Sequence, residues 1–134
     1  MKARTVVPAV RAVGIGIDKD KEQTAREVCE ALGAEYVSAP EYCGGAQIGS
    51  LAGLPGYPGA KTGELSEKEM LIFSGFSREL LEKAVDELRA RGCVIPLKAV
   101  VTKHNAGWTV NELAGELAAE HEAMSQMQRK REGS

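Results

Sequence analysis

Residues 103–109 hold the densest group of chemically capable side chains in this chain of 134 residues. Lys103 could place a positive charge there, Asn105 offers an amide, and Trp108 is the only tryptophan. His104 is the one residue of the group that could transfer a proton near neutral pH. No Ser-His-Asp or Cys-His order can be recognised around it, so the sequence favours binding over catalysis at this loop.

A second polar turn, residues 74–77, follows the apolar run Met70–Phe73 and also leads into a helix-forming segment. The first N–H groups of a helix lack internal partners, and the helix dipole favours negative charge at that end. We therefore expect a small anionic or polar ligand between the two loops. The candidate ligand-binding residues are Ser74, Gly75, Ser77, Lys103, His104, Asn105, Gly107, Trp108 and Thr109.

A purely structural interpretation of the same residues stays open. Gly75 and Gly107 could only shape turns, with Gly107 at positive φ. Ser77 and Thr109 could only cap helices, and Trp108 could only pack against the core. A site inferred from the fold alone is an analogy, so the geometry has to decide between the two interpretations.

The elements that must position these loops form two β-α-β units. In the first unit, an apolar and β-branched stretch predicts a strand over residues 6–17. A capping box of Asp20 and Gln23 opens a helix that Gly33 ends. A short strand over residues 35–38 completes the unit.

The second unit repeats this plan without repeating its residues. Its first strand is the apolar run Met70–Phe73, and a helix capped by Ser77 follows and ends at Gly92. The next strand spans residues 94–102, and residues 109–112 carry a capping box that opens a last helix. These units predict an α/β fold with a mostly parallel sheet of about four strands and a C-terminal helix.

Loops that leave the carboxyl ends of parallel strands gather at one edge of a sheet, where ligands bind. We expect four such loops to share that edge. They are residues 18–20, 42–45, 74–77 and 103–108.

The size of the chain predicts one α/β domain over residues 1–132. Residues 40–66 form a connector within it that is rich in Gly and Pro. A structureless loop of that length is unusual in a compact domain. Ile48, Leu51 and Leu54 could anchor part of the connector as a short helical turn.

With these segments placed, the chain resembles a small prokaryotic family, Domain of Unknown Function 3783. The resemblance covers about residues 70–124 and has three parts: the strand and Gly-Phe-Ser turn over 70–77, the Ile-Pro-Leu-Lys-Ala-Val-Val-Thr segment over 95–102, and Asn105 with the Trp-Thr-Val-Asn-Glu-Leu segment over 108–113. The family has no assigned activity, so the resemblance implies a fold more than a function.

Composition narrows the function classes. The net charge of −2 gives no case for nucleic-acid binding, and no apolar run approaches the length of a membrane span. We expect a cytoplasmic protein with reduced thiols, because its three cysteines form no Cys-x-x-Cys pair. We expect no metal and no cofactor, since His and Cys lack ligand spacing and Gly14-Ile15-Gly16 lacks the rest of a nucleotide-binding motif.

Three functions remain from the sequence. The first is a non-catalytic module that binds a small anionic ligand or a protein partner. The second is a small enzyme or phosphate-binding protein that uses the His104 loop. The third is a thiol-redox protein that uses Cys43, which lies in a Gly-rich loop and could be exposed. A homodimer is expected, because Met124 and Met127 extend the apolar face of the last helix.

The sequence also predicts a core. Six apolar side chains at one-face spacing in the later helices and strand are expected to be largely buried. They are Leu81, Val85, Leu88, Val100, Leu113 and Leu117.

Overall fold

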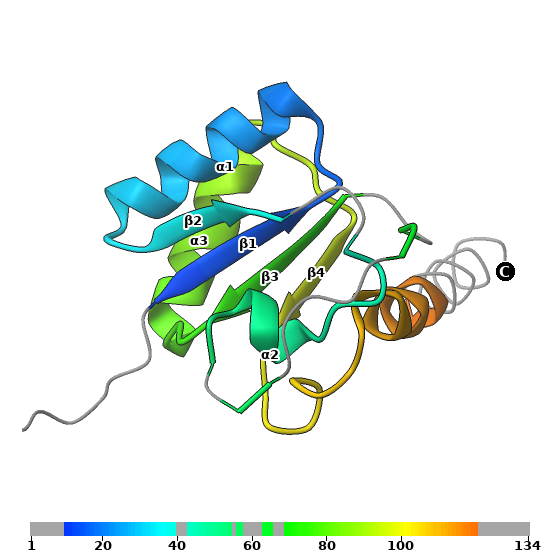
Figure 1. Ribbon diagram of the computed structural model, residues 1–134. Helices are drawn as coiled ribbons and strands as arrows, with labels where there is room; N and C mark the ends of the chain where they lie inside the picture. The colour runs from blue at the N-terminus through cyan, green and yellow to red at the C-terminus, as the bar shows by residue number, and fades with distance from the viewer. Residues whose placement is uncertain (1–9, 40–42, 55, 58–62, 66–68, 121–134) are drawn as a thin grey trace, which may run out of the picture.

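A computed structural model describes residues 10–39, 43–54, 56–57, 63–65 and 69–120 of the chain (Figure 1). Its sheet has four strands in the order β2-β1-β3-β4. The strands are β1 (Arg11–Ile15), β2 (Glu35–Ser38), β3 (Met70–Ser74) and β4 (Leu97–Val100). The pairs β1–β2 and β3–β4 are parallel, which confirms the mostly parallel α/β fold.

The central pair β1–β3 is antiparallel, with Val13 opposite Ile72. The carboxyl ends of β1 and β2 therefore lie at one edge of the sheet, and those of β3 and β4 lie at the other. The prediction that four loops share one edge is wrong for this reason. The loops after β1 and β2 leave one edge, and the loops that begin at residues 75 and 101 leave the other.

Helices cover both faces of the sheet (Figure 1). The helices α1 (Lys19–Ala31) and α3 (Arg78–Ala90) share one core with Leu71 and Phe73. The short α2 (Ile48–Leu51) and a helix over residues 110–120 share the other core with Met70 and Ile72. Because side chains alternate along β3, these two cores lie on opposite faces.

Of the four ends of α1 and α3, three follow the predicted signals. The Ser77 hydroxyl accepts a hydrogen bond from the Leu80 amide at 3.1 Å, as an N-cap does. Gly33 and Gly92 lie just beyond α1 and α3 with φ of 81° and 70°, where a glycine avoids strain. The short helical turn predicted within residues 40–66 is present as α2.

The capping box predicted for Asp20 and Gln23 is wrong. Asp18 is the N-cap residue of α1 and makes no side-chain cap, while the Gln23 amide donates to Glu27. The Glu69 carboxylate, distant in sequence, instead accepts a hydrogen bond from the Asp18 amide at 3.4 Å. A tertiary contact has replaced the local one.

The predicted core is confirmed in part. Leu88 and Leu113 are buried, whereas Leu81 and Leu117 are only partly buried. Val85 is also partly buried. Val100 is 37% exposed, so its prediction is wrong. The reason is its place on β4, at the side of the sheet that α3 does not cover fully.

Candidate functional site

The loop over residues 103–109 is bonded to α2. The amides of Ile48 and Gly49 donate to the carbonyls of Trp108 and Ala106 at 2.8 and 2.7 Å. The Gln47 side-chain amide donates to the Gly107 carbonyl at 3.0 Å. The backbone carbonyls of Ala106, Gly107 and Trp108 are therefore bonded within the protein.

The N-terminus of the helix over residues 110–120 is also satisfied internally. The amides of Val110 and Asn111 donate to the carbonyls of Ala46 and Gly44 at 2.9 and 3.0 Å. Thr109 and Glu112 form the predicted capping box, with the Thr109 amide 2.9 Å from the Glu112 carboxylate. These amides have no N–H left to offer to an anion.

Asn105 organises the turn that precedes this helix. Its side-chain oxygen accepts from the Thr102 amide at 2.8 Å, and its side-chain nitrogen donates to the Val100 carbonyl at 3.0 Å. This closed turn needs no left-handed residue, and Gly107 is not at positive φ, contrary to prediction. Asn105 is a structural residue by these contacts.

The exposed His104 and the partly buried Trp108 form an aromatic pair, with ring centroids 5.3 Å apart in an edge-on arrangement. The surface hollow beside Trp108 is lined by Glu112 and Glu116 as well. Two carboxylates make this surface repel anions. Lys103 is exposed and forms no ion pair among the described residues.

The residues of the other predicted loop, 74–77, have structural roles. Ser74 is a buried end of β3, and Gly75 has the positive φ, 76°, that its turn requires. Phe76 packs edge-on against Phe73 with ring centroids 5.0 Å apart. Ser77 caps α3, so the predicted residues here serve the fold first.

The two loops leave neighbouring strands, since the Val101 amide donates to the Phe73 carbonyl at 2.8 Å. They then part, because α3 and the helix over residues 110–120 cover opposite faces of the sheet. The two helix N-termini therefore do not face one cleft. Whether either loop binds a ligand stays a prediction.

Cys43 does not fit a redox role. Its side chain is 2% exposed, and burial raises the pKa of its thiol above the usual range. A buried thiol with a raised pKa carries little of the nucleophilic thiolate. The prediction of an exposed Cys43 is wrong because the connector folds back, with Cys43 bridged to Gly63.

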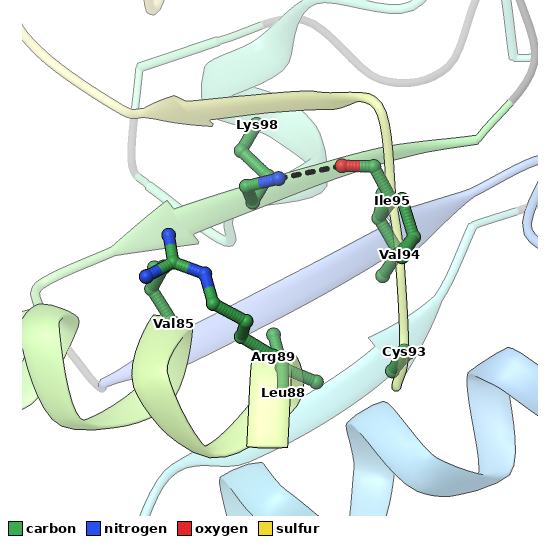
Figure 2. A pocket seen from close by; sticks show the side chains of 7 residues that line it. All are labelled: Val85, Leu88, Arg89, Cys93, Val94, Ile95 and Lys98. Atoms are coloured by element: carbon green, nitrogen blue, oxygen red, sulfur yellow. Dashed lines mark hydrogen bonds between the residues drawn. The ribbon is translucent and has the colours of Figure 1, made fainter. Parts of the chain in front are cut away.

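A pocket that the sequence did not reveal lies between α3 and the start of β4 (Figure 2). Its volume is about 110 Å³. It is lined by Val85, Leu88, Arg89, Cys93, Val94, Ile95 and Lys98. Four of these side chains are aliphatic and two carry positive charge, so the pocket combines an apolar wall with cations.

The electrostatics of the pocket depend on Lys98. Its ammonium donates to the Ile95 carbonyl at 2.6 Å (Figure 2), although much of the side chain is exposed. Partial burial and, next, the Arg89 guanidinium lower the pKa of Lys98. No carboxylate lines the pocket, and the one ion pair of Arg89 in the described residues is an exposed contact with Asp86 at 3.9 Å.

Cys93, at the base of the pocket, is a buried group. Burial raises the pKa of its thiol, and its sulfur lies 3.5 Å from the Lys21 carbonyl to which it donates. A protonated thiol adds no charge to the pocket, so Arg89 and Lys98 set its sign.

Comparison with known proteins finds one family model and assigns no activity. Residues 69–124 match the family model described as Domain of unknown function (DUF3783), which confirms the resemblance seen in the sequence. The match includes the whole pocket and the Trp108 loop. No curated protein and no solved structure matches the chain.

Two further findings concern the described residues alone. None of their helices is long and apolar enough to cross a membrane. No group of three or more His, Cys, Asp or Glu residues among them could hold a metal ion.

Proposed function

We propose that this protein is a non-catalytic binding module that holds the anionic group of a ligand in the pocket between α3 and β4. The observation that carries the proposal is the lining: Arg89 and Lys98 face one small apolar space that contains no carboxylate. Burial and, next, the charge of Arg89 lower the pKa of Lys98, so the two like charges there repel each other. An anion placed between them relieves that repulsion and gains charge-assisted hydrogen bonds.

The size and lining of the pocket fit a small organic anion with a short aliphatic chain. Val85, Leu88 and Val94 supply apolar contacts beside the cations. Butyrate has both features and is a suitable probe. It is expected to bind weakly, because the pocket encloses only a few atoms of ligand.

Titration of the ¹⁵N-labelled chain with butyrate tests this proposal. Butyrate is expected to shift the amides of Val94, Ile95 and Lys98. Lys98→Ala should weaken binding at least about tenfold, because a hydrogen bond to a charged group contributes about 1.5–3 kcal/mol. Lys103→Ala removes the same charge at the opposite edge of the sheet and should leave the affinity unchanged. Equal affinity in both variants would refute the proposal.

The alternative of a small enzyme or phosphate-binding protein at His104 has weaker support, because the amides of that loop bond internally. Phosphate titration tests it directly. The amides of Trp108 and Thr109 are expected to stay still, and only those of Phe76 and Ser77 could respond. Movement of the Trp108 and Thr109 amides would favour this alternative.

A homodimer and a cytoplasmic location are further proposals. The residues that suggested a dimer, Met124 and Met127, lie outside the described residues. Light scattering at high micromolar concentration tests the dimer, and a monomeric mass would reject it.

A further inference from the structure

One face of the sheet is covered incompletely by its helices. In the parallel register of β3 and β4, Leu71 lies opposite Lys98 and Phe73 lies opposite Val100, so all four side chains are on the α1–α3 face. Leu71 and Phe73 are fully buried there, whereas Val100 is 37% exposed. The cover ends between β3 and β4, the outermost strand on that side.

The exposed apolar surface on this face extends beyond the pocket, along β4 to Val100. Among the described residues, Val94 (67% exposed) and Val100 are the exposed large hydrophobic side chains. Val94 lines the pocket, but Val100 does not. Val100 lies two residues beyond Lys98, a step of roughly 6–7 Å along the strand. A ligand confined to the pocket would leave Val100 uncovered, so a longer occupant fits better.

The charges on this surface favour an acidic occupant over a second copy of the chain. Lys98 has no carboxylate partner in the described part of the chain, and Arg89 stands beside it as a like charge. A two-fold contact between copies would bring these cations close to their equivalents. An acidic side chain would instead meet both cations at once.

Addition of a strand to the outer edge of β4 is disfavoured. Pro96, just before β4, has no N–H to donate. The Val100 carbonyl is already taken by the Asn105 side chain. The available surface is the side-chain face of β4 against α3, and a face of that kind is covered by a helix in the rest of this fold.

We propose that the face formed by Val94, Lys98, Val100 and Arg89 docks an amphipathic acidic helix of a partner protein. One carboxylate of that helix reaches Lys98 and Arg89, and its apolar side chains, three or four residues apart, cover Val94 and Val100. This inference rests on the proposed function, because the carboxylate occupies the same pocket. It goes further by naming the molecule that carries the anion, a partner helix, and the surface that this helix covers.

The test uses the full chain and three probes. The first is a synthetic amphipathic helical peptide with leucines on one face and glutamates beside them. The second is the same peptide with glutamine in place of every glutamate, and the third is butyrate. The amides of Val94, Lys98 and Val100 are followed by NMR during each titration.

The glutamate peptide is expected to shift all three amides and to bind at least about tenfold more tightly than the glutamine peptide. Lys98→Glu should abolish that preference, whereas Lys83→Glu, a matched charge change on the α1 side of α3, should preserve it. Val100→Ser should weaken the peptide about fivefold by removing apolar contact, while leaving butyrate affinity unchanged.

Two results would overturn the inference while the pocket proposal stands. They are butyrate binding without any peptide shift at Val100, and equal affinity for the glutamate and glutamine peptides. Concentration-dependent shifts at Val100 without peptide would assign the face to a second copy and also overturn it. If the unaltered chain does not bind butyrate, the pocket proposal itself is refuted.

Discussion

The hydroxyl of Tyr36 occupies the space that a β-carbon on Gly14 would need. That hydroxyl donates to the Glu22 carboxylate at 3.0 Å, and the Ser38 hydroxyl donates to the same oxygen at 2.7 Å. The Arg26 guanidinium lies over the Tyr36 ring, 4.9 Å from its centroid. Gly14 therefore serves packing between β1, β2 and α1, so the glycine at this position is explained without a nucleotide site.

Gly14→Ala should destabilise the protein by about 1–3 kcal/mol, because the added methyl forces Tyr36 out of its place. The measurement is the free energy of unfolding in urea. Gly115→Ala is the matched control, since a β-carbon at Gly115 meets open space. That change should stabilise the helix over residues 110–120 by about 0.5–1 kcal/mol. Equal effects of the two substitutions would contradict this account of Gly14.

The last helix is attached through Leu113 more than through Leu117. Leu113 is 4% exposed in the core with Met70 and Ile72, whereas Leu117 is only partly buried. Leu113→Ala should cost roughly 2–5 kcal/mol in the free energy of unfolding, and Leu117→Ala clearly less. A larger loss for Leu117→Ala would show that the helix contacts the sheet differently.

The sequence was sufficient for the order and type of the elements. Local signals were strong where one residue ends a helix, as Gly92 does, or where two residues form a capping box, as Thr109 and Glu112 do. The apolar run of β3 was also clear, because every residue of that strand is buried. Such features depend on near neighbours in the chain.

The direction of β1 against β3 was not predictable from these signals. Two β-α-β units can join in either direction, and residues 40–66 are long enough for both. The shared cleft between the N-termini of α3 and the last helix was not predictable either, because the two helices cover opposite faces of the sheet, while ligand binding by the two loops stays a prediction. The pocket could not be predicted from the sequence, because Arg89 and Lys98 belong to different elements and only tertiary packing brings them together.

The three cysteines should react slowly in the native protein. Cys29, Cys43 and Cys93 are all buried, and burial is the main cause that raises the pKa of each thiol, to about 11 for Cys29. With a thiol reagent such as Ellman's at pH 7.5, the fast phase of the reaction is expected to modify far less than one thiol per native chain. Unfolding in urea should release all three thiols. Rapid modification of one native thiol, located by mass spectrometry at Cys43, would revive the redox hypothesis.

Glu69 should contribute stability that acid removes. A hydrogen bond from Lys21, at 2.7 Å, is the largest cause that lowers the pKa of Glu69, while burial opposes it. A lowered folded-state pKa means that the contribution is present above the unfolded-state pKa of about 4.3 and is lost as pH falls below it. The unfolding free energy should therefore decline from pH 5 to pH 3 less steeply in Glu69→Gln than in the unaltered chain. Parallel declines would show that Glu69 is uncoupled from folding.

Butyrate affinity should fall with rising pH because of Lys98. The anion favours the charged ammonium, and the pKa of Lys98 lies below its usual value because of partial burial and Arg89. Affinity should therefore begin to fall at a lower pH than an ordinary lysine, with a pKa of about 10.4, would produce. The bound anion should raise that pKa, so binding near the midpoint takes up protons, which calorimetry in buffers of different ionisation enthalpy detects. Lys98→Arg, whose charge persists, should bind butyrate with an affinity that stays flat over the same range. A decline of the same size in Lys98→Arg would place the titrating group elsewhere.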